Sequence, residues 1–220
     1  MKNVFKFVAL FLAFCFVNLY AQHKHNFHND IQNFKKVNAE STLPKDAILF
    51  LGSSSFTKWK DVDNYLPDKT IINRAFGGSR LADLNYYKND LLNPYQPKQI
   101  VIYCGENDIV HKDKPSAKKV FNRFKEFYTS VREHFPKANI AYVSIKYSPS
   151  REDFWPTIKK TNKKIESFLN KQPNADYIDI TQAMNDENGN VRKDLFLEDM
   201  LHMKPEGYKI WTNVMYPYLK

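Results

Sequence analysis

Residues 199–202 of this 220-residue chain read Asp199-Met200-Leu201-His202 and place a carboxylate three residues before an imidazole. On one helical turn or in a tight loop, this spacing lets the carboxylate accept a hydrogen bond from His202 Nδ1 and leaves Nε2 to act as a base. A histidine close to a C-terminal helix is often structural. The carboxylate at this spacing favours the interpretation as a base.

A base of this kind needs a hydroxyl to activate, because serine is a poor nucleophile until a neighbouring group removes its proton. The segment Gly52-Ser53-Ser54-Ser55 follows an apolar run, and its glycine permits a tight turn that would project a serine outward. The backbone N–H of that serine, near the start of a helix, could stabilise negative charge. The alternative is that the serines simply cap a helix.

Two further segments carry hydrogen-bond donors that suit a developing oxyanion. The first is Phe76-Gly77-Gly78-Ser79, where paired glycines allow a ligand to approach the backbone and the Gly78 N–H could donate. The second is Gly105-Glu106-Asn107-Asp108, where Asn107 could direct its amide at the same oxygen. Each segment also reads as an ordinary turn, since Gly, Asn and Asp favour turns for local reasons.

The surrounding sequence predicts elements that would bring these segments together. Five short apolar runs suit buried strands, and segments with helical spacing separate them. This alternation is typical of βαβ units and a parallel sheet with helices on both faces, where ligands bind beyond the carboxyl ends of the strands. The predicted strands are Ala47–Leu51, Thr70–Asn73, Gln99–Cys104, Asn139–Ser144 and Ala175–Ile180; the predicted helices are Leu81–Leu92, Ser116–Phe135, Thr157–Leu169 and Pro205–Tyr218.

The four segments resemble, in order, the four blocks of the SGNH (GDSL-like) hydrolases. Gly52-Ser53-Ser54-Ser55 resembles the family's Gly-Asp-Ser-Leu, and together with Ser144-Ile145-Lys146, Pro149 and Arg151 it is similar to a bacterial subgroup with a Gly-Ser-Ser-Ser block. Gly-x-Asn-Asp and Asp-x-x-His are complete. The resemblance implies a flavodoxin-like three-layer αβα sandwich with about five parallel strands and no cofactor. Its implied site is Ser54 as nucleophile, His202 as base, Asp199 as its partner, and Ser54, Gly78 and Asn107 as the oxyanion hole.

We therefore expect a serine-dependent hydrolase of short-chain acyl esters, with acetylated carbohydrates as the first candidate substrates. Arg151 and Trp155 are candidate substrate-binding residues, because the stretch Tyr147–Trp155 combines aromatic rings with polar groups, and Ser53, next to Ser54, is a third candidate. The alternative for Trp155 and Pro156 is that they only begin the next helix. Two rival functions share the fold: an O-acyltransferase and a non-catalytic carbohydrate-binding relative. The motifs leave the oligomeric state open.

The N-terminal residues predict export. Lys2 and Lys6 precede the apolar run Val8–Val17, and small Ala21 follows, which is the pattern of a signal peptide over residues 1–21. Cleavage there would give a periplasmic or secreted protein that meets the membrane only through this segment; retention as an anchor is the alternative.

The rest of the chain divides into two parts. Residues 22–44 predict a polar, mobile lead-in with some helical spacing, and residues 45–220 the hydrolase domain. Metal binding by His23, His25 and His28 is the less favoured interpretation of that lead-in.

The net charge and the cysteine count bear on the possible binding partners and on disulfide formation. The net charge is +9, but the lysines are spread along the chain and no nucleic-acid motif occurs, so we expect no nucleic-acid partner. If residues 1–21 are removed, Cys104 is the single cysteine and no internal disulfide can form. Its position at the end of an apolar run predicts a buried, inert thiol.

Overall fold

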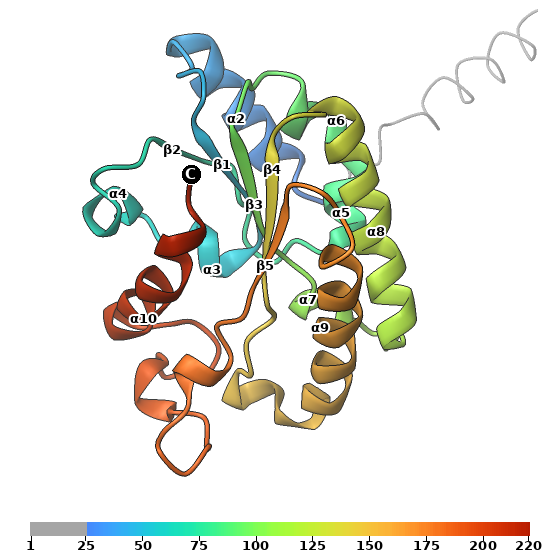
Figure 1. The fold of residues 1–220 in the computed structure, drawn as a ribbon, viewed down its shortest axis with the longest axis vertical. Coiled ribbons are helices and arrows are strands. Elements are labelled where there is room, and N and C mark those ends of the chain that lie inside the picture. Colours follow the sequence, from blue (N-terminus) through green and yellow to red (C-terminus); the bar gives the residue numbers. More distant parts are fainter. Residues whose placement is uncertain (1–25) are drawn as a thin grey trace, which may run out of the picture.

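The five apolar runs form the five strands of one parallel sheet in the computed structural model, which describes residues 26–220. The strand order is β2-β1-β3-β4-β5, the order of flavodoxin-like folds, and Figure 1 shows helices on both faces of the sheet. The predicted three-layer αβα sandwich is therefore confirmed. The strands are β1 (Ile48–Gly52), β2 (Ile71–Asn73), β3 (Gln99–Tyr103), β4 (Asn139–Val143) and β5 (Ala175–Ile178).

Each of the four predicted helical segments is helical in the structure, and the short helices over residues 54–57, 62–65 and 106–109 were not predicted. The expected helix over residues 81–92 is two short helices, because Tyr87 lies between them with non-helical backbone angles (φ −95°, ψ 14°). The α-helices are α2 (His28–Glu40), α3 (Ser54–Thr57), α4 (Val62–Tyr65), α5 (Leu81–Tyr86), α6 (Lys88–Leu92), α7 (Glu106–Ile109), α8 (Ala117–His134), α9 (Trp155–Leu169) and α10 (Pro205–Met215). The 3₁₀ helices are η1 (Pro149–Phe154), η2 (Gln182–Met184), η3 (Lys193–Leu195) and η4 (Tyr216–Tyr218).

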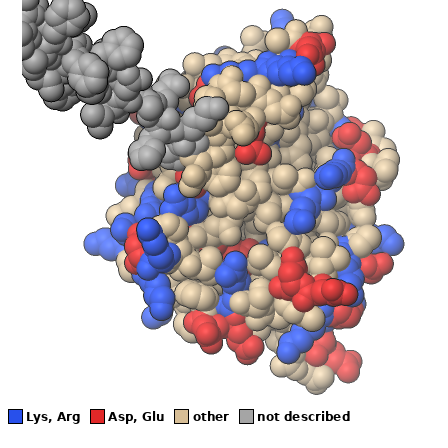
Figure 2. Space-filling model, turned by 180° about the vertical axis from the view of Figure 1, so that it is seen from behind, with Lys and Arg blue, Asp and Glu red and all other residues tan. Residues whose placement is uncertain are grey.

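The sheet separates two hydrophobic cores, because successive side chains of a strand point to opposite faces. In β1, Leu49 and Leu51 pack under α5, α8 and α9, whereas Ile48 and Phe50 pack under α3 and α10. All five β1 residues are buried, as expected for a strand covered on both sides. The face seen in Figure 2 carries interspersed basic and acidic side chains.

The helical spacing of the lead-in segment, at Ile31, Phe34 and Val37, is confirmed, but the segment is packed against the core rather than a mobile arm. From His28 onward it is helix α2, in which Ile31 is buried and Phe34 packs against the core beside α5 and α6. Asn38 binds the Arg74 guanidinium at 2.7 Å and the Tyr95 hydroxyl at 2.8 Å, which fixes the helix to the sheet edge. The third residue of the helical pattern, Val37, is instead 39% exposed.

The predicted signal peptide lies outside the described residues, as do His23 and His25, so export stays a prediction. Within residues 26–220, no helix has the length and apolar character needed to span a bilayer. The same residues contain no cluster of three or more His, Cys, Asp or Glu side chains suited to a metal ion.

Candidate active site

The segment Gly52–Ser55, called here the serine turn, leaves the sheet where β1 and β3 lie side by side. Gly52 pairs with Tyr103 in the sheet, and its φ of 145° lies in a region that favours glycine. A Cβ atom at Gly52 would lie 1.9 Å from the Tyr103 carbonyl oxygen, so no other residue fits there without a backbone shift. The same oxygen accepts a hydrogen bond from the Ser53 N–H at 3.0 Å, which fixes the exit direction of the chain.

The three serines of this turn have different environments. Ser53 and Ser55 are buried, with 2% and 1% exposure, whereas Ser54 is partly exposed. Ser53 is the N-cap residue of α3, yet its side chain makes no capping hydrogen bond, so the alternative of a capping role does not hold for it. The Ser55 hydroxyl is 3.3 Å from Lys146 Nζ. Ser54 is therefore the hydroxyl that an incoming molecule can reach.

Residues 199–202, called here the histidine loop, form a tight loop rather than a helical turn. Asp199 Oδ2 lies 2.5 Å from His202 Nδ1, and Asp199 Oδ1 accepts the N–H groups of Leu201 and His202 at 3.0 and 2.9 Å. Met200 takes a left-handed conformation (φ 51°) that closes the loop. Partial burial would raise the pKa of Asp199, but the hydrogen bonds from His202 and Leu201 outweigh it and lower the pKa from 3.8 to about 2. The carboxylate stays ionised and orients the imidazole.

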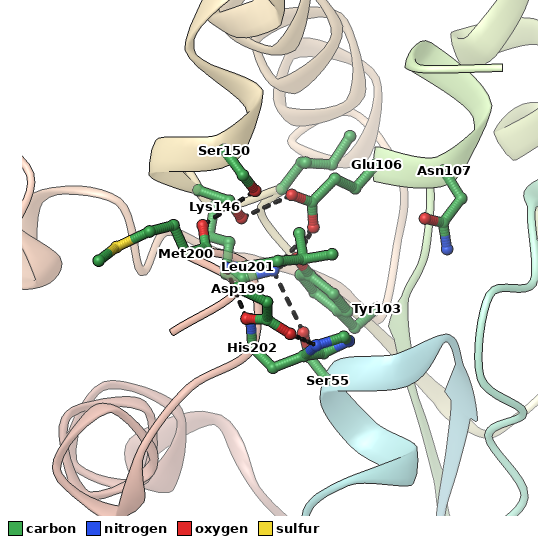
Figure 3. Close-up of polar contacts among 12 residues, drawn as sticks. Ser55, Tyr103, Glu106, Asn107, Lys146, Ser150, Asp199, Met200, Leu201 and His202 are labelled. Carbon is green, nitrogen blue, oxygen red and sulfur yellow. Dashed lines mark hydrogen bonds and ion pairs between the residues drawn. The ribbon is translucent and has the colours of Figure 1, made fainter. Parts of the chain in front are cut away.

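The histidine loop lies against the serine turn through the helix that follows it. Tyr208, in α10, donates its hydroxyl to the Ser55 carbonyl at 2.9 Å and is buried. Figure 3 shows the His202 imidazole extending toward α3, whose second residue is Ser55. Segments about 150 residues apart in the chain are thus held at one edge of the sheet.

The two predicted donor segments are joined to the serine turn and to each other. Residues 76–79 are called here the glycine loop, and its last residue, Ser79, donates its hydroxyl to the Gly52 carbonyl at 3.0 Å. The Ser79 carbonyl in turn accepts a hydrogen bond from Asn107 Nδ2 at 3.1 Å. Gly78 is exposed, with a φ of 83° that favours glycine. An amide nitrogen has two N–H donors, so Asn107 keeps one for a ligand.

The Asp of the Gly-x-Asn-Asp motif has a structural role that the sequence did not reveal. Asp108 is buried, accepts the Leu81 N–H at 2.7 Å and pairs with the Arg123 guanidinium at 2.8 Å. Leu81 begins α5 directly after the glycine loop, so Asp108 fixes that loop next to Asn107. Burial raises the pKa of Asp108, and these hydrogen bonds offset the effect only in part.

Cys104 is buried beside the same loop, as the sequence predicts. The thiol is 1% exposed, and burial raises its pKa well above the usual value of 9.0. Because the thiolate is the reactive form, this environment favours an inert side chain.

The predicted substrate-binding residues do not share one pocket. Trp155 begins α9, as the structural alternative expected, but it also lines a surface pocket of about 850 Å³ together with Tyr147, whose ring centroid is 5.6 Å from its own. Arg151 is not among the residues that line this pocket, and its Nε atom is buried without a hydrogen-bond partner. Ser53 offers a ligand very little surface, because it is almost fully buried.

A buried ion pair lies beneath the serine turn and was missed at the sequence level. Lys146, just after β4, contacts Glu106, in α7, at 2.7 Å, and their side chains are 1% and 6% exposed. A lysine that continues the buried run Val143–Ile145 was the available signal, because lysine is almost never fully buried unless it is paired.

Comparison with known proteins places this fold and its motifs in a family. Residues 50–210 match the GDSL-like Lipase/Acylhydrolase family, which covers most of the chain. The chain therefore belongs to this family of hydrolases, the SGNH hydrolases that its four motifs resemble. A search of curated protein sequences found no match.

Solved structures of low sequence identity share the fold. A Streptococcus pneumoniae protein assigned as a platelet activating factor has a TM-score of 0.77 and 21% identity, over 95% of this chain and 99% of that one. A carbohydrate esterase of family 3 from Talaromyces cellulolyticus has a TM-score of 0.63 and 13% identity, over 79% and 96%. The C-terminal catalytic domain of peptidoglycan O-acetyltransferase A from Streptococcus pneumoniae has a TM-score of 0.56 and 16% identity, over 79% and 92%. At these identities the likeness concerns the fold alone.

Proposed function

We propose that this chain is a serine-dependent hydrolase of short-chain carboxylic esters, with Ser54 as nucleophile and His202 as base. One observation carries the proposal. Ser54 is the accessible serine of the turn, and Tyr208 ties that turn to the helix following the Asp199–His202 pair. Family membership supports the same reaction class.

The proposed reaction begins when His202 Nε2 takes the proton of the Ser54 hydroxyl as Oγ attacks the ester carbonyl carbon. Negative charge then develops on the carbonyl oxygen. The N–H groups of Ser54 and Gly78 and the second N–H of Asn107 are the proposed donors to it, and one such donor typically contributes about 3 kcal/mol to lowering the barrier. His202 returns the proton to the leaving alcohol, and a water molecule repeats the cycle on the acyl-enzyme. Asp199 stabilises the imidazolium throughout.

We further propose acetylated carbohydrates as the substrate class. The pocket lined by Trp155 and Tyr147 also contains the polar side chains Gln182, Asn185 and Asn190. Aromatic rings beside amides suit a sugar, because an aromatic side chain can pack on the apolar face of the sugar while the amides bind the sugar hydroxyls. The fold shared with a carbohydrate esterase agrees with this choice.

The test is a hydrolysis panel of acetyl, butyryl and octanoyl p-nitrophenyl esters and acetylated sugars. We expect release of acetate, fastest for the shortest acyl group, and loss of at least about 1000-fold in kcat for Ser54→Ala. Ser167→Ala changes an exposed serine on α9 and should leave the rate unchanged. Equal rates for Ser54→Ala and the parent would refute the serine mechanism.

Two alternatives are separable by related measurements. An O-acyltransferase shares the acyl-enzyme step, and the fold shared with peptidoglycan O-acetyltransferase A is the reason to test for transfer. Acetylation of an acceptor sugar, in preference to acetate release, would favour it. A non-catalytic carbohydrate-binding relative would show neither product and no covalent labelling of Ser54 by a fluorophosphonate.

A further inference from the structure

We propose that the buried Lys146–Glu106 ion pair positions the proposed nucleophile relative to Asn107, and that it acts through the hydroxyl of Ser55. The inference rests on the proposed function, since it assigns positioning residues to that reaction. Neither side chain is proposed to touch the substrate. Ser55 directly follows Ser54, and Glu106 directly precedes Asn107.

The lysine is held in one orientation by three hydrogen bonds. Lys146 Nζ lies 2.7 Å from Glu106 Oε2, 3.1 Å from the Tyr103 hydroxyl and 3.3 Å from Ser55 Oγ. An ammonium group has three N–H donors, so every one is used. Figure 3 shows these side chains converging beside α3. The Ser55 hydroxyl therefore meets a fixed charge rather than a mobile side chain.

Both carboxylate oxygens of Glu106 accept hydrogen bonds as well. Its Oε2 also accepts the Tyr103 hydroxyl at 3.0 Å, and its Oε1 accepts the Ser148 hydroxyl at 2.6 Å. Glu106 and Asn107 extend in different directions from α7 in Figure 3, one toward Lys146 and the other away from it. Fixing Glu106 therefore fixes the turn of backbone that directs the Asn107 amide.

Stability alone does not account for this arrangement. Two buried charges lose their hydration, and a pair of apolar side chains of similar volume is often as stable or more stable. The pair instead links the turns that carry Ser54 and Asn107, while Tyr208 holds the Ser55 carbonyl from the side of the histidine loop. Preorganised geometry of this kind lowers the barrier of the chemical step without changing how tightly the substrate binds.

The experiment compares steady-state kinetics and thermal unfolding of the parent, Lys146→Met/Glu106→Leu and Ser55→Ala. The double variant removes both charges together, so no unpaired charge is left buried. We expect a lower Tm than that of the parent, because the hydroxyls of Ser55, Tyr103 and Ser148 lose their partners. At a temperature where both proteins are folded, we expect a KM within about twofold and a kcat at least about tenfold lower, with slower fluorophosphonate labelling of Ser54. Ser55→Ala should lower kcat in the same direction.

The route through Ser55 is tested by combining the changes. If the pair acts through that hydroxyl, adding Ser55→Ala to the double variant should lower kcat no further. Asn139→Leu is the matched control. Glu106 and Lys146 follow the carboxyl ends of β3 and β4, whereas Asn139 is buried at the start of β4 and bonds with Gln99 and Asp176. It should lower Tm and leave kcat unchanged.

The outcomes separate this inference from the proposed function. If the parent and all variants hydrolyse no ester, the proposed function fails and the inference fails with it. If the parent is active, Ser54→Ala is inactive and the double variant matches the parent, only the inference is overturned. If the double variant does not fold, Ser55→Ala decides: a parental kcat overturns the inference, and a lowered kcat at parental Tm supports it.

Discussion

Replacing Gly52 by alanine tests whether the serine turn depends on the close approach of β1 and β3. The new methyl carbon would be placed 1.9 Å from the Tyr103 carbonyl oxygen, whereas contacts under 3.0 Å are essentially never tolerated. The obstacle is main chain in the centre of the sheet, so no side chain can rotate away. Either β1 or β3 must move by at least 1.1 Å, the difference between 3.0 and 1.9 Å.

Two effects set the size of the loss. An L-residue at φ 145° is strained by about 1–3 kcal/mol, and overfilling a packed site costs about 1–3 kcal/mol more. We expect Gly52→Ala to lower the free energy of unfolding by about 3–5 kcal/mol. For a chain of this size that corresponds to a fall in Tm of about 10 °C.

The assay is urea unfolding followed by circular dichroism, with Gly77→Ala as control. A Cβ at Gly77 meets nothing within 4 Å, and its φ lies outside the left-handed region, so its unfolding free energy should stay within about 0.5 kcal/mol of the parent. If both variants were as stable as the parent, the geometry derived for the serine turn would be refuted.

Three further predictions concern the same region. The lowered pKa of Asp199, about 2 against 3.8, means that its ionised form stabilises the fold above about pH 4 and that this contribution is lost as the pH falls toward 2. Urea unfolding between pH 2 and 5 should therefore show a shallower pH dependence for Asp199→Asn than for the parent, and parallel curves would contradict the shift. In a Cys15→Ala variant, Cys104 should react with Ellman's reagent only after unfolding, because its thiol is buried and its pKa raised; rapid reaction of the folded variant would show that the site opens. Tyr208→Phe should lower the unfolding free energy by about 1–3 kcal/mol, because it leaves the Ser55 carbonyl without that donor; an unchanged denaturation midpoint would argue against the bond.

The strands could be predicted from the sequence because a parallel sheet covered on both faces needs nearly continuous apolar runs. Each of the five predicted runs is a strand, within two residues at either end. The helix over residues 117–134 could be predicted because Val120, Phe124, Phe127 and Val131, which are buried in the structure, recur at helical spacing. The structure adds that Ser116 caps it. The serine turn and the two donor segments could be placed at the carboxyl edge because each directly follows a strand. The histidine loop does not, since two 3₁₀ helices separate it from β5 and Tyr208 of α10 links it to the serine turn.

The Lys146–Glu106 pair could not be predicted in the same way. Its members lie 40 residues apart and follow different strands, so only the register of β3 against β4 brings them together. A lysine or glutamate after a strand is ordinarily solvated. The docked helix α2 was missed for a related reason: its spacing was visible, but its hold on the core depends on Arg74 and Tyr95, which are distant in the chain.

The contact between Ser150 and the histidine loop has a consequence for selectivity. Both the N–H and the hydroxyl of Ser150 bond to the Met200 carbonyl at 3.0 Å, and Met200 lies between Asp199 and His202. Ser150 belongs to η1, which connects the two aromatic residues of the pocket, Tyr147 and Trp155. A poorly fitting substrate that displaces η1 would also displace Met200 and with it the neighbouring His202 imidazole. Discrimination between sugars should then show in turnover more than in affinity.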